Sequence, residues 1–139
     1  MRFLLIEDDH LQAAGIRSNL KEAFPSAEFD TISTESEFRS RFDEIKKTHY
    51  DVAIVDVMLR WANPAPQMPE QPEDVRKGGF FRAGLRCRER LEGETKIPVV
   101  IYTVLNSSHL PEGTDFVEKS GDLSSLVEKI KEVLKTRVS

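Results

Sequence analysis

Short apolar runs alternate with segments of helical periodicity along the whole of this 139-residue chain. This alternation is typical of β-α-β units, in which parallel strands form one sheet and helices cover both of its faces. The apolar runs are strand candidates, and three of them are almost continuously apolar, as strands buried on both faces are. We therefore expect a single α/β domain over residues 1–139, with strands at 3–6, 27–32, 52–55, 99–102 and 115–117.

The segments between these runs have the spacing of amphipathic helices. The first helix is expected over 11–24, where Pro25 stops it, and Thr34 and Glu37 form a capping-box pattern that opens the second. The second helix should bury Phe38, Phe42 and Ile45, and further helices are expected over 79–91 and from 123 onward, behind the N-cap candidate Asp122.

A proline-dense stretch separates the third strand from the helix that follows it. Residues 62–74 hold four of the seven prolines, and proline can neither donate to a β-ladder nor sit inside a helix. We therefore expect an exposed, extended loop over 62–74, within an inserted loop over 62–78. Behind it, residues 76–90 carry six basic residues against one acidic residue, which predicts a solvated helix face or, alternatively, a docking surface for an acidic partner.

Charge and cysteine content exclude several classes of protein. Twenty basic and 24 acidic residues give a net charge of −4, so we do not expect a nucleic-acid partner. The first apolar run ends after four residues and no run approaches eighteen, which predicts a cytoplasmic protein with no membrane partner. The single cysteine, Cys87, excludes an internal disulfide, so the core must be stable without one.

Reactive side chains follow the predicted strands at their carboxyl ends. Glu7 and Asp8 follow the first strand, Asp56 the third, Thr103 the fourth and Lys119 the fifth. Because the carboxyl ends of parallel strands meet at one edge of the sheet, these side chains should converge. Three carboxylates repel one another unless a cation neutralises them, and oxygen ligands suit Mg²⁺. A metal, a lysine and a hydroxyl beside a carboxylate favour phosphoryl transfer to Asp56.

Four sequence fragments carry a resemblance to a known family. FLLIEDD (3–9), VAIVDVML (52–59), IPVVIYT (97–103) and DFVEK (115–119) resemble, in this order, the motifs of the receiver domain of two-component response regulators. The resemblance covers nearly the whole chain. It implies a flavodoxin-like, doubly wound five-stranded parallel sheet in the order 2-1-3-4-5.

The resemblance also implies a role for each matching residue. Asp56 corresponds to the phosphoacceptor, with Mg²⁺ held by Glu7, Asp8, Asp56 and the backbone carbonyl of Met58. Lys119 corresponds to the lysine that contacts the phosphoryl group, and Thr103 and Phe116 correspond to the switch pair. The chain would then accept a phosphoryl group from a histidine kinase or a histidine phosphotransfer protein and signal to a downstream protein by contact, without being an enzyme.

Several departures from the family keep alternatives open. Arg60 and Ser120 replace prolines, Val104 replaces a very small residue, and the eleven positions 104–114 leave the helix between the fourth and fifth strands shortened or lost. A degenerate receiver that acts as a phosphorylation-independent interaction module is the first alternative. A phosphatase-type hydrolase is weaker, because no second acid stands two residues after Asp56. The pattern leaves the oligomeric state open.

Overall fold

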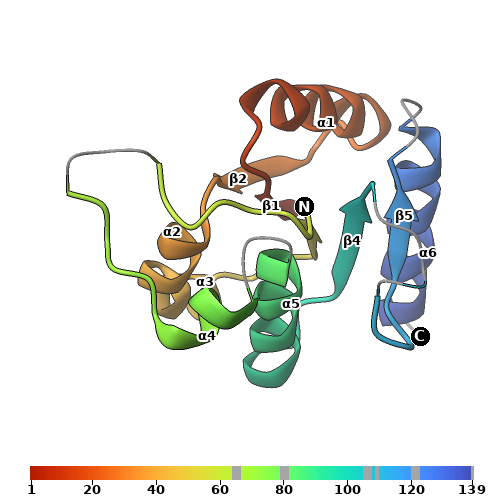
Figure 1. The fold of residues 1–139 in the computed structure, drawn as a ribbon. Helices are drawn as coiled ribbons and strands as arrows, with labels where there is room; N and C mark the ends of the chain where they lie inside the picture. Colours follow the sequence, from red (N-terminus) through yellow and green to blue (C-terminus); the bar gives the residue numbers. More distant parts are fainter. Residues whose placement is uncertain (64–66, 79–81, 105–107, 109, 120–122, 139) are drawn as a thin grey trace.

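The structure, a computed structural model, describes residues 1–63, 67–78, 82–104, 108, 110–119 and 123–138. Its strands form one sheet in the order β2-β1-β3-β4-β5, and all neighbouring strands are parallel (Figure 1). The strands are β1 (Arg2–Ile6), β2 (Glu28–Ile32), β3 (Val52–Val55), β4 (Val99–Thr103) and β5 (Phe116–Glu118). This arrangement confirms the predicted flavodoxin-like fold.

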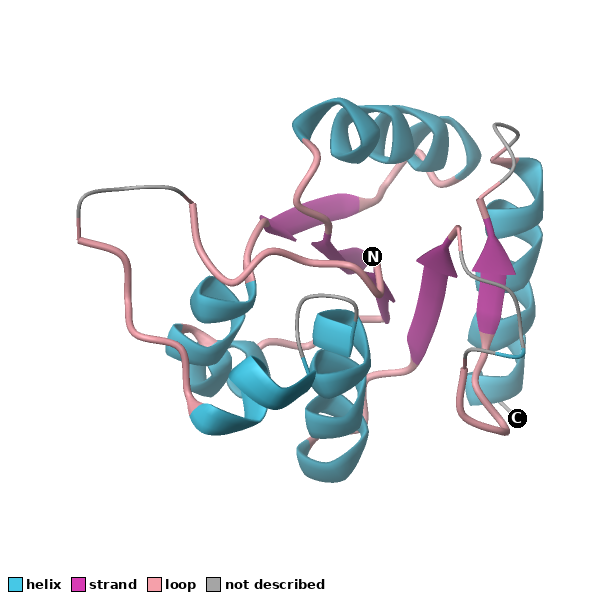
Figure 2. Ribbon diagram, in the orientation of Figure 1, coloured by secondary structure: helices cyan, strands magenta, loops and turns pink. Residues whose placement is uncertain are grey.

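Helices cover both faces of the sheet (Figure 2). They are α1 (His10–Ala23), α2 (Glu35–Ser40), α3 (Phe42–Lys47), α4 (Glu73–Gly78), α5 (Ala83–Glu94) and α6 (Ser124–Val138). Side chains of α1 and α6 pack on one face, and side chains of α2, α3 and α5 pack on the other. Alternate strand residues supply the two cores: Leu4 and Ile6 of β1 face α2, α3 and α5, whereas Phe3 and Leu5 face α1 and α6.

The helix expected after Thr34 is two short helices, α2 and α3, that meet at Arg41. Arg41 has φ −100° and ψ 7°, outside the α-helical region, which separates the two. Thr34 caps α2 as predicted, since its hydroxyl accepts from the Glu37 N–H at 3.2 Å. The Glu37 carboxylate, however, accepts from the N–H of Ser33 at 3.0 Å, one residue before the cap. The predicted inward residues of this region are nevertheless fully buried.

The expectation of an exposed, extended loop over 62–74 is wrong at both of its ends, because Ala62 is buried and α4 begins at Glu73. Ala62 is buried beside Trp61, and Val75 of α4 completes this small core cluster. Helix α4 can form because Pro72 stands at its start, where a missing N–H costs nothing, and the Pro72 carbonyl accepts from the N–H groups of Val75 and Arg76 at 3.1 Å. The inserted segment therefore has a core and a helix of its own.

The basic segment is not simply a solvated face. The Arg86 side chain is 16% exposed and its guanidinium binds the buried Glu35 carboxylate through two bonds of 2.8 and 2.7 Å. Arg90 lies over the ring of Phe42, 4.0 Å from its centroid. Arg86 and Arg90 therefore help to pack α5 against α2 and α3. A count of basic residues in the sequence could not predict these contacts.

The chain between β4 and β5 has no α-helix among its described residues, in line with the prediction of a shortened or lost helix. Residues 105–107 and 109 of this stretch lie outside the described residues. The same holds for residues 79–81 of the helix predicted over 79–91, and for Ser120 and the cap candidate Asp122. Within the described part of the chain, no helix is long and apolar enough to cross a membrane.

Candidate functional site

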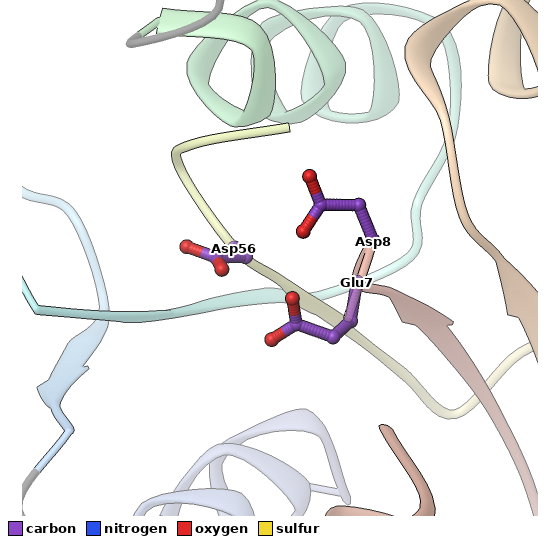
Figure 3. A group of neighbouring side chains, drawn as sticks. All are labelled: Glu7, Asp8 and Asp56. Atoms are coloured by element: carbon purple, nitrogen blue, oxygen red, sulfur yellow. The ribbon is translucent and has the colours of Figure 1, made fainter. Parts of the chain in front are cut away.

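Three carboxylates meet at the carboxyl edge of the central strands. Glu7 and Asp8 come directly after β1, and Asp56 comes directly after β3. Ile6 and Val55 are partners in the β1–β3 register, so the residues that follow them leave the sheet side by side. Figure 3 shows the three carboxylates turned toward one another, and one oxygen of each lies within 4.8 Å of the others.

Lys119 joins two of these carboxylates. Its ammonium group donates to Glu7 at 2.9 Å and to Asp56 at 3.0 Å. The backbone N–H of Lys119 bonds the carbonyl of Thr103 at 2.7 Å, which anchors the residue just beyond the β4–β5 pairing. Four predicted site residues from three strand ends are therefore in one place, as the rule of converging strand ends predicts.

The carboxylates are crowded enough to disturb their protonation. Burial and the neighbouring Asp56 charge raise the pKa of Glu7 to about 7, although Lys119 acts in the opposite direction. Burial lowers the pKa of Lys119, but Asp56 and Glu7 together outweigh it and hold that pKa above its ordinary value. The raised pKa of Glu7 reflects burial together with repulsion between neighbouring carboxylates, and a divalent cation bound here would relieve that repulsion.

Two further residues reach the site, and the sequence reasoning missed both. Gln12, in the first turn of α1, accepts a hydrogen bond from the Lys119 ammonium. Arg60 donates its backbone N–H to Asp8 at 3.2 Å, and its guanidinium Nε lies 3.5 Å from the same carboxylate oxygen. A proline at this position could not donate that N–H, so the substitution noted in the sequence adds a contact here. Asp9 caps α1, which places Gln12 in the first turn.

The remaining predicted residues stand beside the cluster. Met58 donates its N–H to Asp56 Oδ1 at 3.3 Å, so Lys119 and Met58 bind different oxygens of the Asp56 carboxylate; the metal contact of the Met58 carbonyl stays a prediction. Thr103 is fully buried at the end of β4. Phe116 pairs with Ile101 at the start of β5 and packs, half-buried, against the core on the α5 side. Their role as a switch pair stays a prediction.

A cavity of about 680 Å³ opens beside the three carboxylates. Glu7, Asp8, Asp56 and Lys119 line one part of it. The other part is walled by residues of the inserted segment and the chain that leads into it: Leu59, Trp61, Ala62, Met68, Gln71, Val75 and Arg76. The insertion thus enlarges the site rather than standing apart from it, which the proline pattern did not suggest.

The donor set fits a magnesium ion. Mg²⁺ is bound in proteins by one or two carboxylates together with carbonyl, water and phosphate oxygens. Glu7, Asp8 and Asp56 supply carboxylate oxygens that are close together and turned inward. Among the residues that the structure describes, this is the one group of three or more potential ligands placed to hold a metal ion.

Comparison with solved structures places this arrangement among known folds. No family profile and no curated protein sequence matches the chain. A two-component response regulator from Clostridium difficile superposes with a TM-score of 0.70 at 19% identity, covering 100% of this chain and 99% of that one. The BeF3-activated N-terminal receiver domain of Klebsiella pneumoniae RstA gives 0.69 at 17% identity, covering 97% and 99%.

A third structure, the response regulator TrrA from Thermotoga maritima in complex with Mg²⁺-BeF, superposes with a TM-score of 0.57 at 22% identity. That match covers 95% of this chain and 97% of TrrA. All three likenesses extend over nearly the whole chain. This chain has the fold of the response-regulator receiver domains.

Proposed function

We propose that this protein is a phosphoacceptor switch of a two-component or phosphorelay system, with Asp56 as the acceptor. The observation that carries the proposal is the placement of Asp56 between Lys119, 3.0 Å away, and the two further carboxylates Glu7 and Asp8. A single lysine–carboxylate pair could be structural. Three neighbouring carboxylates, two of them bonded to one lysine, in a cavity have the charge and the opening that a phosphoryl group with a cation needs.

In this proposal Glu7, Asp8, Asp56 and the Met58 carbonyl hold Mg²⁺, which would offset negative charge on the transferred oxygens. One Asp56 oxygen attacks phosphorus while the bond from phosphorus to the donor's imidazole nitrogen breaks. The imidazole leaves with the electron pair of that bond, and it is neutral once free because its other ring nitrogen carries a proton when the bond breaks. Lys119, already bonded to Asp56 Oδ2, supplies a fixed positive charge beside the new phosphoryl oxygens.

The donor would be a histidine kinase or a histidine phosphotransfer protein, and the output would be contact with a downstream protein. The acceptor would receive and lose one phosphoryl group rather than turn over a substrate. The alternative is a phosphorylation-independent interaction module. One contact in this structure supports it: Arg60 is paired with Asp8. If that pair were to exclude the metal, Asp56 could not be phosphorylated.

Incubation with a small phosphodonor separates these functions. Intact mass spectrometry should show a gain of one phosphoryl group with Mg²⁺, none with a chelator, and none for Asp56→Asn, because the amide cannot act as the nucleophile. Asp51→Asn, which changes a carboxylate bonded to the Arg2 N–H outside the cavity, is the matched control and should label like the parent. No gain in the parent would favour the interaction module, and labelling of Asp56→Asn would place the acceptor elsewhere.

Thr103 should separate phosphorylation from response. Thr103→Ala is expected to accept the phosphoryl group at Asp56 but to lose the conformational response, because the hydroxyl that would turn toward the phosphoryl oxygens is gone. Amide chemical shifts of β5 and Phe116 before and after phosphorylation would measure this response, with Thr103→Ser as the control that keeps a hydroxyl. Equal shift changes in Thr103→Ala and the parent would show that Thr103 is not the switch.

A further inference from the structure

The cavity beside Asp56 is larger than the proposed phosphoryl transfer requires. A water molecule takes up about 30 Å³ of liquid, so a phosphoryl group with a hydrated ion fills only a fraction of a 680 Å³ space. Cavities of about 300–1,000 Å³ are the size at which proteins enclose small organic ligands. The additional room lies against the inserted segment and the residues that lead into it, most of which stand outside the receiver motifs.

The added wall is mainly apolar. Leu59, Trp61, Ala62, Met68 and Val75 contribute to it, and the first three and Val75 are buried, whereas Met68 is 45% exposed. An apolar side chain left half-exposed in the wall of a cavity loses its contact with water when a ligand covers it. Met68 is flexible and polarizable, which suits contact with an aromatic or aliphatic group of variable shape.

This wall is held in place by specific contacts. The Trp61 indole N–H donates to the Pro69 carbonyl at 2.7 Å and closes the inserted segment on itself. The carbonyls of Arg60 and Trp61 accept from the first N–H groups of α2, those of Glu35 at 3.0 Å and Ser36 at 2.8 Å. A pocket whose walls are built before the ligand arrives loses less conformational entropy on binding.

An ion pair holds the C-terminal end of the inserted segment against α2. Asp74 of α4 pairs with Arg39 of α2 at 2.7 Å, and the same guanidinium lies over the Trp61 ring, 5.7 Å from its centroid. Arg39 therefore holds both ends of the wall. Arg76, one helix turn from the Pro72 carbonyl that starts α4, brings a positive charge to the apolar part of the cavity.

We infer that the cavity binds a small organic phosphate with an apolar body. The phosphoryl end would lie by Lys119 and the three carboxylates with their cation, and the apolar body would cover Met68 and the neighbouring wall. Arg76 at the cavity favours ligands with a net negative charge. The inference rests on the proposed function for its phosphoryl end, and it adds a ligand subsite that the inserted segment and the chain leading into it supply.

Two phosphonates that differ only in their organic group test the apolar wall. With Mg²⁺ present, phenylphosphonate should bind at least about tenfold more tightly than methylphosphonate, measured by calorimetry, because the ring buries apolar surface that the methyl group cannot reach. Trp61 is the sole tryptophan, so its emission should change on phenylphosphonate binding and locate the ligand in this cavity.

Met68→Gln keeps the size of the side chain and makes it polar, at a position exposed enough to tolerate the change. It should reduce the phenyl-to-methyl preference to about twofold or less. Leu11→Gln is the matched control: Leu11 is 85% exposed and does not line the cavity, so this variant should keep the full preference. Equal binding of the two phosphonates by the parent, or an unchanged preference in Met68→Gln, would overturn the inference.

The outcome is independent of phosphorylation, since a phosphonate cannot transfer its phosphorus group to Asp56. If the inference about the apolar wall is wrong, the two phosphonates should bind with equal affinity, while Asp56 still gains mass with a phosphodonor. If the proposed function is wrong, Asp56 should gain no mass with a phosphodonor. The preference for phenylphosphonate can still be measured in that case, because it does not depend on phosphorylation.

Discussion

Gly84→Ala is expected to lower the free energy of unfolding by about 3 kcal/mol, the upper end of the usual cost of overpacking. Gly84 stands in the first turn of α5, where its N–H bonds the Val57 carbonyl at 2.7 Å. A Cβ built on it would lie 1.9 Å from the Asp56 carbonyl oxygen and 2.6 Å from the Val57 Cα. Both atoms are backbone, so no side chain can turn away.

The same substitution should also impair phosphorylation. An alanine side chain can fit only if α5 or the peptide of Asp56 moves, and Asp56 is held to Lys119 and Met58 by bonds of 3.0 and 3.3 Å. We therefore expect the Gly84→Ala protein that remains folded to label more slowly than the parent. A displacement of about 1 Å can cost a factor of about a hundred in rate where the geometry of reacting groups matters.

Gly93→Ala is the matched control, on the same helix. A Cβ at Gly93 would meet no atom within 4 Å, so alanine should raise the free energy of unfolding by about 0.4–1 kcal/mol through the lower entropy of the unfolded chain. Urea unfolding followed by Trp61 emission measures both variants. If Gly84→Ala and Gly93→Ala shifted the free energy of unfolding alike, the close approach of α5 to the backbone of Asp56 and Val57 would not be real.

The sequence was sufficient for the sheet because its signal is local and strong. Every residue of β3 is buried, and its uninterrupted apolar run had indicated this. The site followed from the sheet, since Glu7 and Asp56 succeed paired residues of neighbouring parallel strands. The apolar runs in the sequence, together with the rule that carboxyl ends of parallel strands meet at one edge of a sheet, were enough to place these site residues near one another.

The residues that the sequence did not reveal depend on contacts between distant segments. Arg60 meets Asp8 from 52 positions away, and Gln12 meets Lys119 from 107. Neither belongs to a periodic pattern, so no rule selects them before the fold is known. Helix α4 could not be predicted for a different reason: the prolines before it argue against a helix, yet the last of them, Pro72, stands directly before its first residue, where a missing N–H removes no helical hydrogen bond.

Glu35 is a further case, and it leads to the second large effect that we expect. As an acid at the start of an amphipathic helix it should be solvated, yet its side chain is 1% exposed and receives Arg86 through two bonds and Arg39 through a third, of 3.1 Å. Arg86→Met should lower the free energy of unfolding by about 3 kcal/mol, because it leaves a buried carboxylate with one partner instead of two.

The control for this variant is an ion pair of the same kind at the surface. Lys77 and Glu73 form an i,i+4 pair at 3.3 Å on α4, and both side chains are more than three-quarters exposed. Lys77→Met should change the free energy of unfolding by less than about 0.5 kcal/mol, since water and salt already screen the pair. A cost for Arg86→Met as small as that for Lys77→Met would mean that Glu35 reaches water in solution.

The double variant Glu35→Leu with Arg86→Met distinguishes loss of a pair from loss of packing. If the main cost of Arg86→Met is the unpaired buried charge, removing that charge as well should recover part of it, and the double variant should lose at least about 1 kcal/mol less than the two single variants summed. Summed losses equal to the loss in the double variant would show that Arg86 acts through its hydrocarbon stem alone. Because Glu35 also bonds the Arg60 carbonyl through its N–H at 3.0 Å, partial recovery would further show that α2 can hold the wall of the cavity without its buried charge.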